Sequence, residues 1–297
     1  MNGKTTYILD YFELIGVVPD QEEATSEVRV MSFNIRFENE WDDVNIWNNR
    51  KENVAKMIEQ RSPLVLGLQE VLHGQLMYLA EKLSNTYSYV GVGRNDGHHG
   101  GEYSPVFYNH TQLDLLDSGT FWLSETPWVV GSRGWDSACV RICTWGKFQL
   151  KDSPNSLPFF VFNTHLDHRS QKARLEGLKL IVNFFYAWTR FCPGFITGDL
   201  NEQPTEPAVA NILDPDTAFP LVLKDSQTDC EMPMAGPTFT FNNWDCSSEL
   251  CWIDYILVKP YMRVMRFEVI DELAEGRTLS DHFPILSDAL LNLSPPY

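Results

Sequence analysis

The stretch FITGDLN, residues 195–201, closes an apolar run with a glycine, a carboxylate and an amide. Successive side chains of an extended strand point to opposite faces, so Asp199 and Asn201 share one face while Leu200 points to the other. Because Gly, Asp and Asn are common turn residues, a simple turn after a buried strand is the plainer explanation when the stretch is taken alone. The rest of the sequence decides between that turn and a functional strand end.

Other apolar runs along the chain place residue types used in catalysis in or beside a strand. The runs are MSFNIRF, LVLGLQE, FFVFNTHLD, CWIDYIL and TLSDHFPIL, and the polar residues that they carry are Asn34, Glu70, His165, Asp254, Asp281 and His282. Each has a structural alternative: a surface carboxylate, a bulge, a buried core histidine, an ion pair or a turn. An unpaired buried carboxylate is costly, however, and ligands often bind where strand ends converge, so their joint occurrence indicates a site.

The composition describes a soluble globular chain of 297 residues, with 43% hydrophobic and 21% charged residues. This length fits one large domain or two small ones. The 23 Lys and Arg residues against 40 Asp and Glu residues give a net charge of −17, without a basic cluster. Binding of duplex DNA normally needs a basic face, so duplex DNA is a disfavoured partner. A small phosphate ester held by a metal ion stays compatible, because a local cation outweighs distant charge.

The chain shows no apolar run near the ~20 residues that a membrane span requires. Residues 1–27 lack the apolar core and cleavage site of a secretory signal, and we expect them to be an N-terminal extension ahead of a domain at 28–297. The six cysteines include no C-x-x-C pair, which favours free thiols in a reducing compartment over disulfides. We therefore expect a cytoplasmic monomer.

Runs rich in Val, Ile, Phe and Tyr, bounded by Gly, Asn, Asp or Pro, predict strands. They lie at 28–37, 64–71, 87–94, 104–109, 139–150, 158–167, 194–201, 251–259 and 264–271, with another strand after Asp281. Helical spacing of apolar residues predicts helices at 48–62, 74–83 and 170–190, with Ser170 placed to cap the last, and a short helix at 206–213. The elements do not alternate strictly, which favours an α/β fold of two packed sheets flanked by helices.

In order, the blocks SFNIR, LQE, NTHLDH, GDLN, IDYIL and SDHFPI resemble the signatures of the endonuclease/exonuclease/phosphatase superfamily, which has the deoxyribonuclease I-like fold. One block is weakly specific, whereas all of them in the right order are specific, and the resemblance covers residues 28–291. It implies a four-layer α/β sandwich, with two mixed β-sheets and helices outside. GTFWLSETP (119–127) and GWDSACVRICTW (134–145) resemble a branch of small phosphohydrolases near the deadenylase-related proteins.

This resemblance implies hydrolysis of a phosphate ester with Mg²⁺ or Mn²⁺ as cofactor. Glu70 matches the principal metal carboxylate, and Asn34 and Asp281 match residues beside that metal. Asp199 matches the residue that orients and deprotonates the attacking water, and Asn201 matches the amide that hydrogen-bonds the phosphate or the water. A hard divalent ion prefers such oxygen ligands and usually keeps several waters.

The histidines complete the set that the resemblance implies. His165 and His282 match the pair that flanks the scissile phosphate, and Asp254 matches the carboxylate that orients a histidine and favours its charged form. Phosphoryl transfer depends on positioning and charge neutralisation, which metal, carboxylate and cationic imidazole supply. In this context Asp199 and Asn201 share a face because both reach one water and one phosphate.

The sequence leaves the substrate open among a nucleotide, an RNA 3′ end and a sugar or lipid phosphate. A deadenylase-like 3′–5′ exoribonuclease is the alternative within the same reaction class. A catalytically silent binding protein is less favoured, because every matched catalytic position is filled. A zinc hydrolase using His165, His168 and His282 is disfavoured, because oxygen ligands are interleaved with those histidines. Arg141, in an otherwise apolar strand, either reaches the phosphate or pairs with an acidic neighbour.

Overall fold

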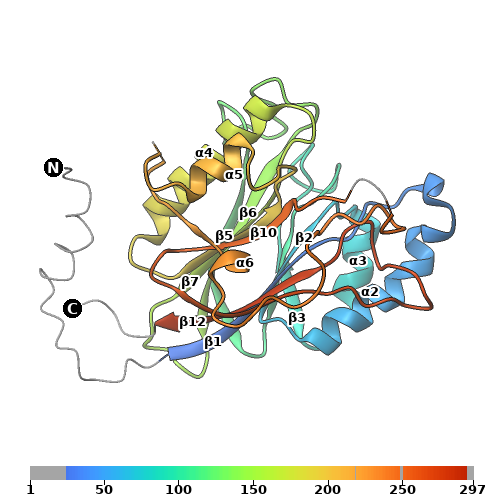
Figure 1. Cartoon of the computed structure of the whole chain (residues 1–297), viewed down its shortest axis with the longest axis horizontal. Coiled ribbons are helices and arrows are strands. Elements are labelled where there is room, and N and C mark those ends of the chain that lie inside the picture. The colour runs from blue at the N-terminus through green and yellow to red at the C-terminus, as the bar shows by residue number, and fades with distance from the viewer. Residues whose placement is uncertain (1–24, 218, 248–249, 293–297) are drawn as a thin grey trace, which may run out of the picture.

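Two mixed sheets of six strands form the centre of the computed structural model, which describes residues 25–217, 219–247 and 250–292 (Figure 1). The first sheet, in the order β11-β12-β1-β2-β4-β3, consists of β1 (Thr25–Asn34), β2 (Val65–Gln69), β3 (Tyr87–Val90), β4 (Val106–Asn109), β11 (Arg263–Val269) and β12 (Ile285–Asn292). The second, in the order β5-β6-β7-β8-β10-β9, consists of β5 (Leu113–Trp122), β6 (Ile142–Leu150), β7 (Phe159–His165), β8 (Gly194–Asp199), β9 (Lys224–Asp225) and β10 (Asp254–Val258).

Helices cover the outer faces of both sheets and complete the four-layer α/β sandwich that the sequence predicts. In Figure 1, α2 (Trp47–Arg61) and α3 (His73–Lys82) lie on one side, and α4 (Gln171–Thr189) and α5 (Pro207–Leu213) lie on the other. Two short elements, the 3₁₀ helix η1 (Glu40–Asn45) and α6 (Ser226–Asp229), lie in connections. Ser170 caps α4 as expected, because its hydroxyl accepts a hydrogen bond from the backbone N–H of Ala173 at 3.1 Å.

The central strands are apolar on both faces because each face is covered. Along β1, Met31 and Phe33 belong to the core beneath α2 and α3, whereas Val28 and Val30 belong to the core between the sheets. All four side chains are fully buried. This alternation produces the continuous apolar runs that the sequence shows.

A polar network is buried where the two sheets face each other. Ser32 of β1, Gln69 of β2, Asn163 of β7 and Thr197 of β8 are all inaccessible to solvent. Gln69 donates to Asn163 Oδ1 at 2.7 Å and to Ser32 Oγ at 3.1 Å, and Thr197 Oγ1 donates to the same Asn163 oxygen at 3.0 Å. Gly67 makes room for this network, because a Cβ atom there would lie 2.3 Å from Thr197 Oγ1.

The Asn163 amide nitrogen extends the network to the backbone of the first sheet. It donates to the carbonyl of Leu68 at 2.7 Å and to that of Pro105 at 3.0 Å. Buried hydrogen bonds of this kind are directional, whereas apolar packing is not, so they fix the register of one sheet against the other.

The elements that the sequence prediction missed or misplaced lie mainly at edges. Strand β5 was not anticipated, since its sequence LDLLDSGTFW is largely exposed on one face and carries acidic residues. Residues Thr25–Glu27, assigned to an N-terminal extension, begin β1, and the remainder of that extension lies outside the described residues. Cys139, Cys143, Cys192, Cys230 and Cys246 are free thiols. Within the described part of the chain, each helix is too short or too polar to span a lipid bilayer.

We predict that Asn163→Leu lowers the free energy of unfolding by roughly 2–4 kcal/mol, because Gln69 and Thr197 lose a buried acceptor and two carbonyls lose a donor. Urea denaturation measures this loss. Gln149→Leu is the matched control, since its amide bonds only the nearby Ser153 and Ser156, and it should cost about 1 kcal/mol. Equal stability of the two variants would contradict a special role for the interface network.

Candidate active site

The topology of the sheets brings the predicted site residues to one edge of the molecule. Strand β1 is parallel to β2 and β7 is parallel to β8, while β12 and β10 run antiparallel to β1 and β8. The carboxyl ends of the first four strands therefore meet the amino ends of the last two. The residues at this edge are Asn34, Glu70, His165, Asp199, Asn201, Asp254, Asp281 and His282.

The buried network lies directly beneath this edge. Asn34, His165 and Asp199 each follow a network residue by two positions in the same strand, so each side chain projects from the same face as its network neighbour. The pairing registers agree, with Asp199 opposite His165 on one side and opposite Asp254 on the other. The register that the network fixes therefore also fixes these three side chains.

Asn34 joins the two sheets at the site. Its amide nitrogen donates to Glu70 Oε1 at 3.0 Å and to Asp199 Oδ2 at 2.9 Å, and it lies 3.4 Å from His282 Nε2. Its Oδ1 accepts the backbone N–H of Arg36 at 3.0 Å. Asn is uncommon within a strand, and here the amide holds two carboxylates from different sheets at a shared donor.

Several site residues adopt a backbone conformation that is costly for residues other than glycine. The φ angles are +57° at Arg36, +61° at Glu70 and +49° at Asn201. Each such residue costs on the order of 1 kcal/mol or more, and such strain concentrates at functional sites. Glu70 Oε2 accepts the N–H of Phe37 at 3.1 Å, and the N–H of Asn201 donates to Asp199 Oδ1 at 2.9 Å. The strained turns thus aim both carboxylates into the site.

His282 forms a buried ion pair with Asp254. The ring Nδ1 lies 2.9 Å from Asp254 Oδ2, and both residues are nearly inaccessible. Burial lowers the pKa of His282, but the charge of Asp254, the hydrogen bond to it and the charge of Asp199 outweigh burial and raise the pKa to about 10. The imidazole is therefore cationic at neutral pH, with Nδ1–H donated to Asp254 and Nε2 3.7 Å from Asp199 Oδ2.

His165 differs from His282, because its surroundings favour the neutral ring. Burial and then the charges of Arg141 and Arg94 hold its pKa well below the usual value. The amide nitrogen of Asn201 donates to the carbonyl of Leu166 at 3.1 Å and lies 2.9 Å from His165 Nε2, so Nε2 accepts. The ring proton therefore lies on Nδ1. The sequence did not distinguish the charges of the two rings, and the structure provides one cation and one neutral ring.

Asp199 lies at the centre of the site and is fully enclosed. Its Oδ2 is 3.4 Å from His165 Nε2 and accepts the Asn34 amide. Burial, followed by the charge of Asp254, raises the pKa of Asp199 above the ordinary aspartate value. A carboxylate with a raised pKa is suited to accept a proton near neutral pH.

The donor set fits a hard divalent cation. Ligand atoms of Glu70, His165 and Asp199 lie within 4.8 Å of one another. Both oxygens of Glu70 accept neutral N–H groups, and none of the ion pairs among the described residues includes Glu70. Asp281 adds a further carboxylate, 3.6 Å from the guanidinium of Arg36, and burial raises its pKa. Oxygen ligands of this kind favour Mg²⁺ or Mn²⁺.

The zinc-type set proposed from the sequence is not assembled. A second group of possible ligands comprises Asp199, Asp254 and His282, so His165 and His282 fall in different groups. His168 belongs to neither of these groups, and its Nδ1 instead lies 3.1 Å from Arg141. Among the described residues, no group of three histidines surrounds one point.

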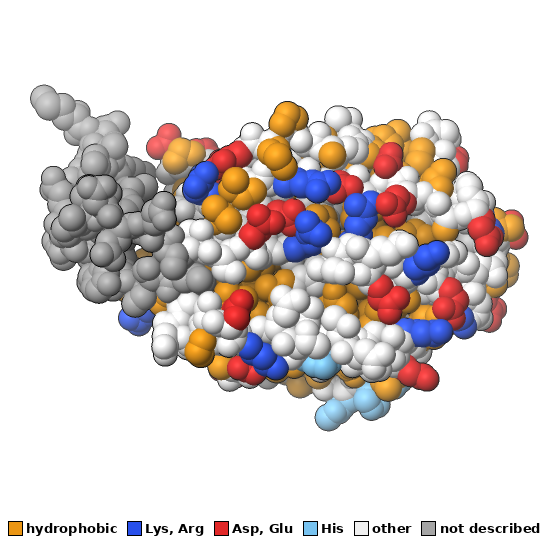
Figure 2. Space-filling view, turned by 90° about the horizontal axis from the view of Figure 1, so that it is seen from below, with side chains coloured by type: hydrophobic (Ala, Val, Ile, Leu, Met, Phe, Trp, Pro, Cys, Tyr) orange, Lys and Arg blue, Asp and Glu red, His pale blue; other side chains and the backbone are white. Residues whose placement is uncertain are grey.

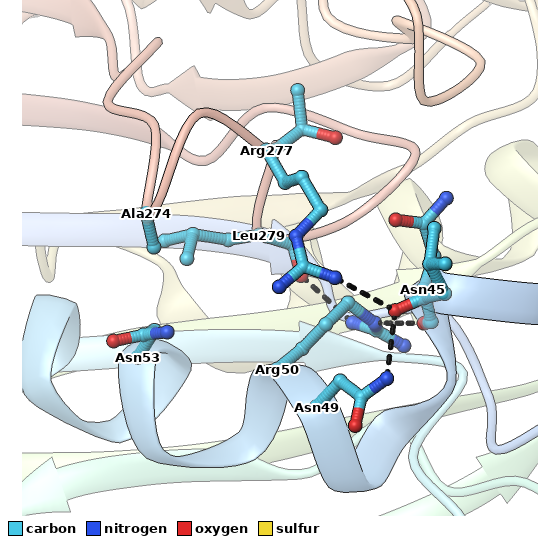
Figure 3. A pocket seen from close by; sticks show the side chains of 9 residues that line it. Asn45, Asn49, Arg50, Asn53, Ala274, Arg277 and Leu279 are labelled. Atoms are coloured by element: carbon cyan, nitrogen blue, oxygen red, sulfur yellow. Dashed lines mark hydrogen bonds between the residues drawn. The ribbon is translucent and has the colours of Figure 1, made fainter.

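Arg50 of α2 braces the segments that carry Asn34 and Asp281, and the sequence analysis did not identify it. Figure 3 shows Arg50 among the residues that line a small pocket between α2 and the loop before β12. Nη1 donates to the carbonyls of Ile35 at 2.9 Å and Leu279 at 2.7 Å, and Nε donates to that of Asn45 at 2.6 Å. These bonds tie the end of β1 to the loop before β12. No local pattern marks Arg50, because all three carbonyls come from outside its helix.

Comparison with known proteins gives consistent matches. The family model described as Endonuclease/Exonuclease/phosphatase family matches residues 31–282. A solved endonuclease/exonuclease/phosphatase from Bacteroides vulgatus is 37% identical, with a TM-score of 0.83, and the match covers 91% of this chain and all of that one. A solved mannosyl-6-phosphatase from Bacteroides thetaiotaomicron is 36% identical, with a TM-score of 0.77, over 88% of this chain and 99% of that one.

A more distant curated relative is Nocturnin of Drosophila melanogaster. The identity is 24% over an alignment that is 292 residues long, gaps included. The alignment covers 84% of this chain. The match spans only 42% of the length of that relative.

We predict that Asp254→Asn lowers the pKa of His282, because the variant removes the largest charge that opposes burial. At pH 8 the imidazole should be protonated in the wild type, whose pKa is about 10, and its titration midpoint should move to lower pH in the variant. Side-chain ¹⁵N NMR across a pH titration measures this shift. An unchanged midpoint in Asp254→Asn, or a neutral His282 at pH 8 in the wild type, would contradict this account of the pair.

Proposed function

The chain belongs to the endonuclease/exonuclease/phosphatase family, and from that premise we propose that it hydrolyses phosphoric esters with Mg²⁺ or Mn²⁺ as cofactor. The observation that carries the proposal is the Asn34 amide, which holds Glu70 and Asp199 from two sheets at one point between two imidazoles of different charge. The similarity to a mannosyl-6-phosphatase supports a phosphate ester as the substrate.

In this proposal Glu70 is the principal ligand of the cation, with Asn34 and Asp281 beside it. When bound, a divalent ion supplies charge neutralisation on a phosphate oxygen and orients the ester. The remaining steps belong to protein side chains that surround Asp199.

Asp199 is proposed to take a proton from the attacking water. Its raised pKa suits a general base, and the Asn201 N–H and Asn34 amide fix its two oxygens in different directions. General-base catalysis contributes about 10²–10⁴ in rate. The Asn201 side chain lies beside the same carboxylate and His165, where it can orient the water or the phosphate.

The two imidazoles are proposed to act on the phosphate from different sides. The cationic His282, held by Asp254, stabilises the negative charge that develops on the phosphate oxygens. The neutral His165 offers its Nδ1–H, which has no hydrogen-bond partner among the described residues. Because neither imidazole needs to move, the charge distribution is preorganised.

The surface charge supports a small or single-stranded ester over duplex DNA. The net charge is −17, and in Figure 2 the Lys and Arg side chains on the visible face are interspersed with Asp and Glu. A duplex binder usually presents a continuous basic face. An RNA 3′ end, the alternative from the sequence, is tested in the same experiment.

Hydrolysis is measured on a panel of bis-4-nitrophenyl phosphate, 4-nitrophenyl phosphate, oligo(A) RNA, duplex DNA, a nucleotide and a sugar phosphate. Each is assayed with Mg²⁺, Mn²⁺, Zn²⁺ or EDTA. We predict turnover with Mg²⁺ or Mn²⁺ that EDTA abolishes, and a loss of about 10²-fold or more in Asp199→Ala and in His282→Ala. His110→Ala, which alters a half-buried histidine directly after β4, at the sheet edge opposite the candidate site, should retain wild-type activity.

Two outcomes would refute the proposal. Turnover that persists in EDTA would show that the reaction needs no divalent cation. Full activity in Asp199→Ala would show that Asp199 is not the general base. Preferential cleavage of oligo(A) with the same metal dependence would instead favour the exoribonuclease alternative.

A further inference from the structure

Arg141 is a buried cation beside the site whose hydrogen-bonding capacity is largely unused. It lies directly before β6, and its side chain is 5% exposed. Nη2 lies 3.1 Å from His168 Nδ1, but Nε and Nη1 have no hydrogen-bond partner among the described residues. Arginine cannot shed its charge in proteins, so burying it with free N–H groups is unfavourable unless a ligand supplies acceptors.

The nearest carboxylate does not fill this role. Asp167 Oδ2 is 3.8 Å from Arg141 Nε, which is too long for a hydrogen bond. Its two oxygens instead accept the backbone N–H groups of Ala138, Cys139, Arg169 and Ser170. Asp167 therefore offsets the charge of Arg141 and positions the loops around it, but leaves the guanidinium N–H groups open.

Two other residues contribute unpaired N–H groups to the same place. Arg94 Nη1 donates to Glu102 Oε2 at 2.7 Å, whereas its buried Nε has no partner. The same Glu102 oxygen lies 4.0 Å from His165 Nδ1, which is also buried and unpartnered. Arg141 lies two residues before Cys143, which pairs with Thr164 next to His165, so it lies at the same end of the β6–β7 pair as His165. We call Arg94, Arg141 and His165 the cationic corner.

The cationic corner adjoins the reaction centre through the ring of His165. Nε2 of that ring faces Asn201 and Asp199, while Nδ1 faces the corner. The metal-ligating carboxylates and the cationic His282 lie on the Asp199 side. The unpaired N–H groups of the corner therefore lie next to the reaction centre, on the Nδ1 side of the His165 ring.

We propose that the cationic corner binds a terminal phosphate oxygen and that the substrate is a phosphate monoester. This inference rests on the proposed function and specifies its substrate class. A bound diester presents two unbridged oxygens, whereas a monoester presents three and carries a charge near −2 at neutral pH. A cation held by Glu70 and the cationic His282 would each neutralise one oxygen, and the cationic corner would supply donors and positive charge for the third.

The enclosure of the corner agrees with a terminal group. His165 is 7% exposed, Arg141 is 5% exposed and Asp167 is 1% exposed. A diester within a polymer has to continue on both sides of the scissile phosphate. The buried guanidinium and its supporting loops occupy one of those sides.

The test compares 4-nitrophenyl phosphate with bis-4-nitrophenyl phosphate in the metal-loaded protein. The wild type should prefer the monoester, and Arg141→Met should lower kcat/KM for the monoester by about 10²-fold or more while changing the diester value less than about threefold. Arg141→Lys should recover part of the monoester activity, because it keeps the charge but not the fork of donors. Lys259→Met, which removes a buried cation at the opposite end of β10, is the matched control.

Equal losses on both substrates in Arg141→Met, or a wild type that prefers the diester, would overturn the inference. Calorimetric titration with inorganic phosphate gives a second readout that needs no turnover: binding should weaken at least about tenfold in Arg141→Met, and unchanged binding would also overturn it. If Arg141→Met does not fold, the wild-type preference and Arg141→Lys decide. Absence of metal-dependent turnover of either ester would refute the proposed function, while phosphate binding would still test the corner.

Discussion

The hydrogen bond between Gln69 and Asn163, buried between the two sheets, is the constraint on which the site depends. Apolar packing would tolerate sliding of one sheet over the other, whereas an amide pair without solvent has few satisfactory arrangements. Two residues after Ser32 of the same network, the Asn34 amide nitrogen donates to Asp199 Oδ2 on the other sheet at 2.9 Å. Sub-ångström placement of groups from different sheets, which phosphoryl transfer needs, is thereby built into the core.

Charge is distributed unevenly around the centre that this core supports. On one side Glu70 takes part in no ion pair among the described residues, and on the other Nε and Nη1 of the buried Arg141 lack acceptors. A charge without a counterpart is unfavourable, most of all where it is buried. A cation and a phosphate dianion, bound together, satisfy both. The unpaired charges on the two sides of the candidate site are therefore complementary to the proposed cation and phosphate.

The sequence predicted the fold class, and the candidate site residues that it singled out come together at one edge, but it did not predict their electrostatics. Asn34, Glu70 and Asp199 were identifiable because a polar residue in an apolar strand needs an explanation that local structure does not supply. The role of Arg50 was hidden, since its partners come from segments far apart in the chain. The different charges of His165 and His282 could not be predicted from the sequence either, because they depend on neighbours from several strands.

The central claim is that one divalent cation and one phosphate occupy the edge where the two sheets meet. A crystal structure grown with Mn²⁺ and inorganic phosphate, with anomalous diffraction at the manganese edge, tests it directly. The account predicts manganese coordinated by Glu70 and phosphate between His282 and Arg141. Manganese bound away from Glu70, or phosphate bound elsewhere with Arg141 still unpaired, would contradict it.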